Sequence, residues 1–146
     1  MEEESMSLSV LGDLNWFAVI VAGVAFFAIG GLWYSNALFG KHWSEAVGWE
    51  MPEDEKPPVT LYLVPLLTCV VSAVAVAMLA EATGTHTLGD GIVLGLVTGL
   101  GLAAMALLVT GFFDPKKARP MVWVAITSGY HVVGLVVVAV IVSVWQ

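Results

Sequence analysis

The chain has 146 residues, of which 59% are hydrophobic and only 12% are charged, and its mean hydropathy is +0.92. A soluble domain of this length cannot bury that much apolar surface, so the composition indicates a protein whose partner is the lipid bilayer. The net charge of -7, without a basic stripe to neutralise phosphates, excludes nucleic acid as a partner.

The first predicted helix spans about residues 15–35 and follows a short acidic segment. Its apolar run is long enough to cross the hydrocarbon core. Trp16 at one end and Trp33-Tyr34 at the other fit the two headgroup regions, where amphipathic rings are favoured. The run is too long, and its leading segment too acidic, for a signal peptide. We therefore expect it to stay in the mature protein.

Residues 36–58 form the longest connection. Apolar side chains recur there at spacings of three and four residues, from Leu38 to Val47. This pattern predicts either a short helix in the interface plane or an ordered loop packed on the bundle end. Pro52, the acidic run at 53–55 and Pro57-Pro58 then predict a solvated turn.

Three further helices are predicted, over about residues 59–80, 91–113 and 121–145. The third helix of the chain carries small residues every four positions, so they share one face. In lipid, such a glycine zipper lets another helix approach closely, either within the chain or in a second copy. These helix-packing residues are Gly91, Gly95, Gly99 and Ala103.

The fold class expected from these elements is an all-α membrane protein with one domain over residues 1–146. Four transmembrane helices form an antiparallel bundle, and a short interfacial segment lies between the first two. All five Lys and Arg residues fall in the first and third connections. The positive-inside rule then places both termini outside the cell membrane. The acidic surface on a chain rich in Ala, Val and Gly also indicates a salt-loving, halophilic source.

His131 is the ionisable residue expected deepest in a membrane helix, about ten residues or roughly 15 Å from its start. Two interpretations stay open, a neutral ring that fixes helix packing and a group that handles a ligand or a proton. In both, we expect a neutral, inward-pointing imidazole. Its predicted partner is a hydroxyl of Thr68, Ser72 or Thr127, and Tyr130 lies beside it.

Two groups of residues resemble the signature of the domain-of-unknown-function family 1761. The first joins Asn15-Trp16 to residues 31–35 (Gly-Leu-Trp-Tyr-Ser) and to Phe-Gly-Lys at 39–41 with Trp43. The second joins Arg-Pro at 119–120 to Gly-Tyr-His at 129–131. The resemblance implies a chain of similar length with four membrane helices, and it implies no activity. From the first motif, Asn15, Trp33, Tyr34 and Ser35 complete the candidate ligand-binding residues.

Two classes of function follow. The first is a small-solute transporter or binding protein with a polar pocket around His131. The second is a structural or accessory subunit that forms a homo-oligomer, or docks a partner, through the glycine-ridged helix. An enzyme is disfavoured because Ser128 and His131 lack an activating third group. No cofactor or metal is expected, since the histidines are too far apart to act together and a metal needs more ligands.

Overall fold

The computed structural model describes residues 7–50 and 54–146, and within these ranges the chain is helical without a strand. Part of the turn expected around Pro52 and Glu53 lies outside them. In chain order the elements are η1 (Leu8–Gly12), α1 (Trp16–Trp33), α2 (Gly40–Val47), α3 (Thr60–Ala82), α4 (Leu88–Leu96), η2 (Val97–Ala104), α5 (Met105–Phe113) and α6 (Pro120–Val144).

Within the described residues, four helical stretches are long and apolar enough to cross a membrane: α1, α3, the continuous run Leu88–Phe113 and α6. Their positions agree with the apolar runs of the sequence. The third begins earlier than residue 91 because Thr87 caps it. The Thr87 hydroxyl accepts from the Asp90 backbone N–H at 3.1 Å and donates to the Asp90 carboxylate at 2.6 Å. Both bonds satisfy polar groups at the helix start.

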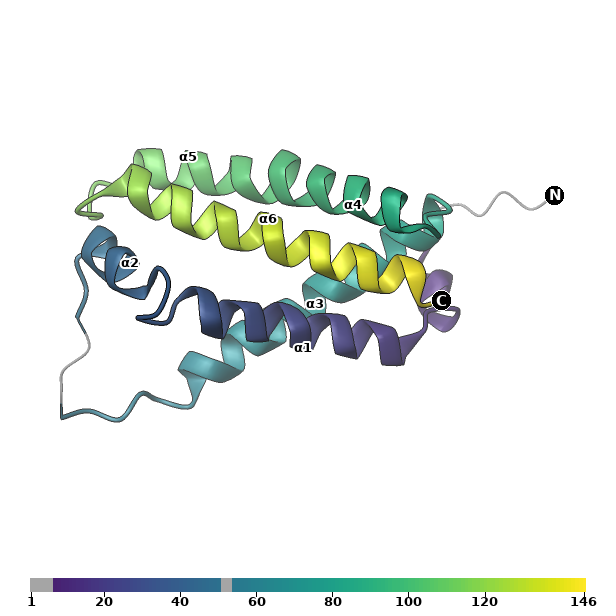
Figure 1. Ribbon diagram of the computed structural model, residues 1–146, viewed down its shortest axis with the longest axis horizontal. Helices are drawn as coiled ribbons and strands as arrows, with labels where there is room; N and C mark the ends of the chain where they lie inside the picture. Colours follow the sequence, from purple (N-terminus) through teal and green to yellow (C-terminus); the bar gives the residue numbers. More distant parts are fainter. Residues whose placement is uncertain (1–6, 51–53) are drawn as a thin grey trace.

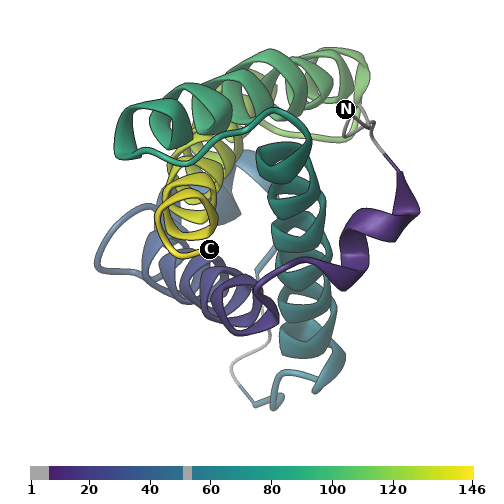
Figure 2. The ribbon, with the colours of Figure 1, turned by 90° about the vertical axis from the view of Figure 1, so that its right-hand side faces the viewer.

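The last helix, α6, is the centre of the molecule. Viewed along the bundle, α6 lies between α1 on one side and α4–α5 on the other, with α3 beside α1 (Figure 2). It contributes more buried residues than any other described helix, including Val138 and Ala139 with no exposed surface. The helices α1, α4 and α5 therefore pack mainly on α6, whereas α3 packs on both α1 and α6.

Gly91, Gly95 and Gly99 lie against the backbone of α6. A Cβ atom added at Gly95 would come within 2.9 Å of Val136 N and 3.0 Å of Leu135 O, and one at Gly99 would lie 2.9 Å from Val132 Cα. Side chains at these positions would push the two helices apart. Ala103, the last member of the predicted row, is half-buried against the core.

The middle of this third span is a π-helix, η2, where the sequence predicts a continuous α-helix. The Thr98 hydroxyl bonds the carbonyl oxygens of Leu94 and Gly95 at 2.9 and 3.3 Å. Such side-chain bonds compete with the regular i→i−4 ladder. Further along η2, Gly101 has no heavy atom within 4 Å of its Cβ position, so it faces away from the bundle.

The first half of α3 diverges from the other helices (Figure 1). Cys69 and Ala73 are buried, yet Pro65, one turn earlier on the same face, is exposed and Tyr62 is 53% exposed. Pro65 has no N–H to donate to the Leu61 carbonyl, and its ring crowds that carbonyl, which favours a bend. The inward-packing face of α3 is thus buried from Cys69 onward and exposed in the two turns before it.

The short helix α2 packs on the end of the bundle, beside the α5–α6 connection. The Arg119 N–H donates to the Ala46 carbonyl at 3.0 Å, and the Trp43 ring contacts that of Tyr34. The segment is therefore both helical and packed on the bundle. Figure 1 places η1 and the end of α6 at the opposite end from α2 and the α5–α6 connection.

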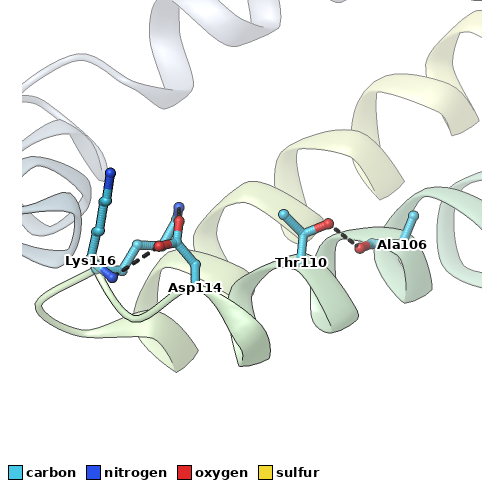
Figure 3. Close-up of polar contacts among 5 residues, drawn as sticks. Ala106, Thr110, Asp114 and Lys116 are labelled. Carbon is cyan, nitrogen blue, oxygen red and sulfur yellow. Dashed lines mark hydrogen bonds and ion pairs between the residues drawn. The ribbon is translucent and has the colours of Figure 1, made fainter.

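Polar groups close the α5–α6 connection. The Asp114 carboxylate accepts from the Lys116 N–H at 2.9 Å and from the Lys117 ammonium at 2.5 Å (Figure 3). These hydrogen bonds, led by the one from Lys117, hold the pKa of Asp114 below its ordinary value. Lys117 also lies 4.3 Å from the Trp123 ring centre, a cation–π distance.

Candidate functional site

The motif that follows α1 builds a tight corner into α2. The Phe39 N–H donates to the Trp33 carbonyl at 3.0 Å, and the Gly40 N–H donates to the Ser35 carbonyl at 2.9 Å. A Cβ at Gly40 would strike the Tyr34 carbonyl oxygen and lie 2.8 Å from the Ser35 carbonyl group, so only glycine fits there. The Trp33 and Phe39 rings pack with centroids 4.9 Å apart. The motif thus holds an aromatic cluster at the end of α1.

Aromatic rings from α1 and α6 sit on glycines of the opposite helix. The Tyr130 hydroxyl lies 3.0 Å from the Cβ position of Gly30, and the Trp33 ring lies 3.0 Å from that of Gly129. The Trp33 indole N–H also donates to the Ile126 carbonyl at 2.9 Å. The Gly-Tyr-His segment and the Trp-Tyr-Ser segment are therefore two sides of one contact.

Tyr130 joins three helices. Its hydroxyl donates to the Phe26 carbonyl on α1 at 3.4 Å and lies 3.3 Å from the Cys69 sulfur on α3. Its ring contacts those of Phe26 and Tyr34, with centroids 4.9 and 5.3 Å apart. Because protein groups occupy the hydroxyl, Tyr130 positions the helices around the site. Nothing in the position of Cys69 in the sequence predicts its contact with Tyr130.

The His131 ring is half-buried, and its Nδ1 donates to the Thr127 backbone carbonyl at 2.8 Å. A carbonyl can only accept, so Nδ1 carries the proton and Nε2 is an acceptor in the neutral ring. Within the described residues Nε2 has no hydrogen-bond partner. The expected bond to a hydroxyl of Thr68, Ser72 or Thr127 is wrong, because the carbonyl one turn back on its own helix is already in reach.

The other sequence candidates separate in space. The exposed Thr68 hydroxyl bonds the Pro65 carbonyl of its own helix at 2.9 Å, and Ser72 is half-buried on α3. Ser35 bonds the Leu32 carbonyl at 2.7 Å and so caps the end of α1. Asn15 caps the start of α1 and donates to the Trp145 carbonyl at 3.3 Å, at the far end of the bundle. Asn15 and Ser35 thus form hydrogen bonds at helix ends, and Thr68 bonds the backbone of its own helix.

Two hydroxyls beside His131 are buried without a partner among the described residues. They are Thr127 Oγ1 and Ser128 Oγ. Thr127 is only 8% exposed. A buried hydroxyl left unpaired costs about 1–3 kcal/mol. These two oxygens and His131 Nε2 form a polar cluster with free capacity to donate and accept. Ser128 was not among the sequence candidates, although its place next to Thr127 is a usable signal.

In residues 7–50 and 54–146, no three His, Cys, Asp or Glu side chains gather closely enough to hold a metal ion. The cluster on α6 therefore offers hydrogen bonds rather than metal ligands. The hydroxyls of Thr127 and Ser128 can each donate and accept a hydrogen bond.

In the part of the chain that the structure describes, the fold is all-helical and has four helices long and apolar enough to span a membrane. The model of the family described as "Protein of unknown function (DUF1761)" matches residues 17–143, and the chain belongs to that family. The match includes both motif segments that meet at Tyr130. No curated protein and no solved structure matches the chain.

Proposed function

We propose that the protein is a multi-pass protein of the cell membrane that binds, and carries, a small solute at the polar cluster of Thr127, Ser128 and His131. One observation supports this proposal, the pair of buried hydroxyls without partners next to His131. Polar groups inside a membrane helix are costly and mark binding sites when no protein group satisfies them. A bound solute would supply the missing bonds.

Binding is tested with the purified protein in lipid nanodiscs, by thermal unfolding against a panel of small uncharged solutes. Thr127→Val keeps the side-chain shape and removes the hydroxyl. We expect it to abolish solute-dependent stabilisation while preserving the fold. Thr110→Val is the control, since the exposed Thr110 hydroxyl already bonds the Ala106 carbonyl at 2.8 Å (Figure 3). Equal responses of the two variants would contradict a site at Thr127.

The alternative, a subunit that associates through the glycine ridge, has less support. The backbone of α6 covers Gly91, Gly95 and Gly99 within the same chain. A partner helix could use that face only by displacing α6. The ridge is better interpreted as the seam that fixes α6 and the site it carries.

For orientation, we propose that the four spans alternate in direction, with both termini outside and the basic connections in the cytoplasm. The support is the grouping of Lys41, Lys116, Lys117 and Arg119 at one end of the bundle. In a Cys69→Ala background, an impermeant thiol reagent added to intact cells should label Gln146→Cys and not Lys116→Cys. Labelling of Lys116→Cys would reverse the orientation.

A further inference from the structure

The connection between α5 and α6, residues 114–119, carries more positive than negative charge. It contains Lys116, Lys117 and Arg119 against one acidic residue, Asp114. The Asp114 carboxylate accepts from the Lys117 ammonium at 2.5 Å, so these two charges compensate each other. Lys116 bonds the same carboxylate only through its backbone N–H, and its side chain extends away (Figure 3). Among the described residues, the Lys116 ammonium has no ion-pair partner.

Arg119 adds a second cation that the chain compensates only weakly. Its guanidinium lies 4.0 Å from the Glu45 carboxylate, and the two side chains are 58% and 45% exposed. An ion pair this long and this exposed contributes little, so an anion from outside the chain competes easily with Glu45. The backbone of Arg119 is fixed by its bond to the Ala46 carbonyl at 3.0 Å, and this keeps its side chain beside the connection.

Exposed apolar side chains lie directly before these cations. Phe112 and Phe113 end α5, are 67% and 74% exposed, and contact each other with ring centroids 5.0 Å apart. The end of a helix that crosses a membrane reaches the headgroup region, where aromatic rings are favoured. Apolar rings followed by ammonium and guanidinium groups match the order of acyl chain and phosphate in a phospholipid.

The positive charge is specific to this connection. Residues 48–59, which lead from α2 to α3, contain four acidic residues and one cation, Lys56. Figure 1 shows α2 between the α5–α6 connection and the start of α3. At the opposite end of the bundle, the described residues 7–15, 83–90 and 145–146 contain no Lys or Arg. An anion at a membrane surface is therefore attracted to the α5–α6 connection rather than to the other ends of the helices.

From these observations we propose that residues 112–119 bind the headgroup of an anionic phospholipid. Lys116 and Arg119 are three residues apart, within reach of one headgroup, and both donate charge-assisted hydrogen bonds to its phosphate. The acyl chains lie against Phe112 and Phe113. This surface is distinct from the polar cluster on α6 and does not depend on the solute proposed there.

The test measures the unfolding temperature of the protein in nanodiscs of phosphatidylcholine with a rising fraction of phosphatidylglycerol. We expect a saturable rise in the unfolding temperature. Lys116→Gln should increase the half-saturating fraction of phosphatidylglycerol about fivefold, the loss expected for one lysine at an anionic surface. Lys56→Gln is the matched control, because it removes a lysine of the same end from the acidic connection, and it should leave the half-saturating fraction unchanged.

Phosphatidylcholine alone shows whether the variants fold. The Lys116 side chain forms no hydrogen bond or ion pair with a described residue, so Lys116→Gln should unfold there at the same temperature as the unmodified protein. Arg119→Gln supplies a second variant, in which the backbone bond to Ala46 is kept and the response to phosphatidylglycerol should again weaken.

Inorganic phosphate, added to phosphatidylcholine nanodiscs at the ionic strength of a sodium chloride reference, separates a lipid from a free anion. We expect no stabilisation by phosphate. A stabilisation by phosphate that requires Lys116 would overturn the lipid as the ligand. Equal responses of Lys116→Gln and Lys56→Gln to phosphatidylglycerol, or an unmodified protein that does not respond to it, would overturn the surface itself.

Discussion

Replacing Gly95 with Ala tests whether the contact between α4 and α6 determines the stability of the protein. The new Cβ would lie 2.9 Å from Val136 N and 3.0 Å from Leu135 O, and closer still to Val136 Cα. All three atoms belong to the backbone of α6, so rotation of a side chain cannot relieve the clash. Ordinary contact begins near 3.4 Å, and the helices must separate by about half an ångström or more.

Overpacking of this kind costs roughly 1–3 kcal/mol, and the loss extends along the seam because contacts at Gly91 and Gly99 are stretched too. The intrinsic helix preference of Ala over Gly returns at most about 1 kcal/mol. We therefore expect a net destabilisation of up to about 2 kcal/mol. Gly101→Ala is the matched control, because its Cβ position meets nothing within 4 Å and only the helix preference changes.

The assay is unfolding of both variants in mixed detergent micelles, with the fraction of SDS as the denaturant. Gly95→Ala should unfold at a lower SDS fraction than the unmodified protein, and Gly101→Ala at an equal or higher one. If the two variants unfold together, the α4–α6 seam does not limit stability, and the packing argument is refuted.

Three further outcomes are expected. Trp33→Phe keeps an aromatic ring but loses the bond to the Ile126 carbonyl, so unfolding should cost about 0.5–1.5 kcal/mol less; an unchanged denaturation midpoint would contradict that bond. Gly40→Ala should weaken the α1–α2 corner and speed proteolysis within α2, and equal digestion rates would show that the corner tolerates a side chain. The lowered pKa of Asp114 means that its bond to Lys117 stabilises the fold above the ordinary Asp pKa and is lost as the pH falls through the lowered value. Asp114→Asn should therefore flatten the acid side of the stability–pH curve, and a curve of unchanged shape would exclude this contribution.

The sequence predicts the four long helices because lipid imposes a length and a composition on any segment that crosses it. The helix starts depend on short polar side chains such as Asn15 and Thr87, which bond backbone atoms close to them in the chain. The partner of His131 was missed because a local carbonyl competes with distant hydroxyls, and local geometry decided the outcome. The divergence of α3 was missed because a proline such as Pro65 looks the same in the sequence whether or not neighbouring groups compensate for the bend that it causes.

The position of Tyr130 in the site depends on contacts between helices, which the hydrophobic periodicity of the sequence does not predict. Its contacts with Gly30 and Cys69 join residues about a hundred and about sixty positions away in the chain. The motifs named the residues at this junction, but only the packed helices show that Trp33 and Tyr130 belong to one contact.

The central position of α6 has a consequence for biosynthesis. The ribosome synthesises α1, α3 and the α4–α5 span before α6, the helix that all of them contact. Until α6 inserts, Gly91, Gly95 and Gly99 have no backbone to meet, and the aromatic corner after α1 lacks the Gly-Tyr-His segment. A nascent chain stopped before residue 120 can still form the contact between α1 and α3, but the glycine seam and the aromatic corner can close only after the last helix has been made.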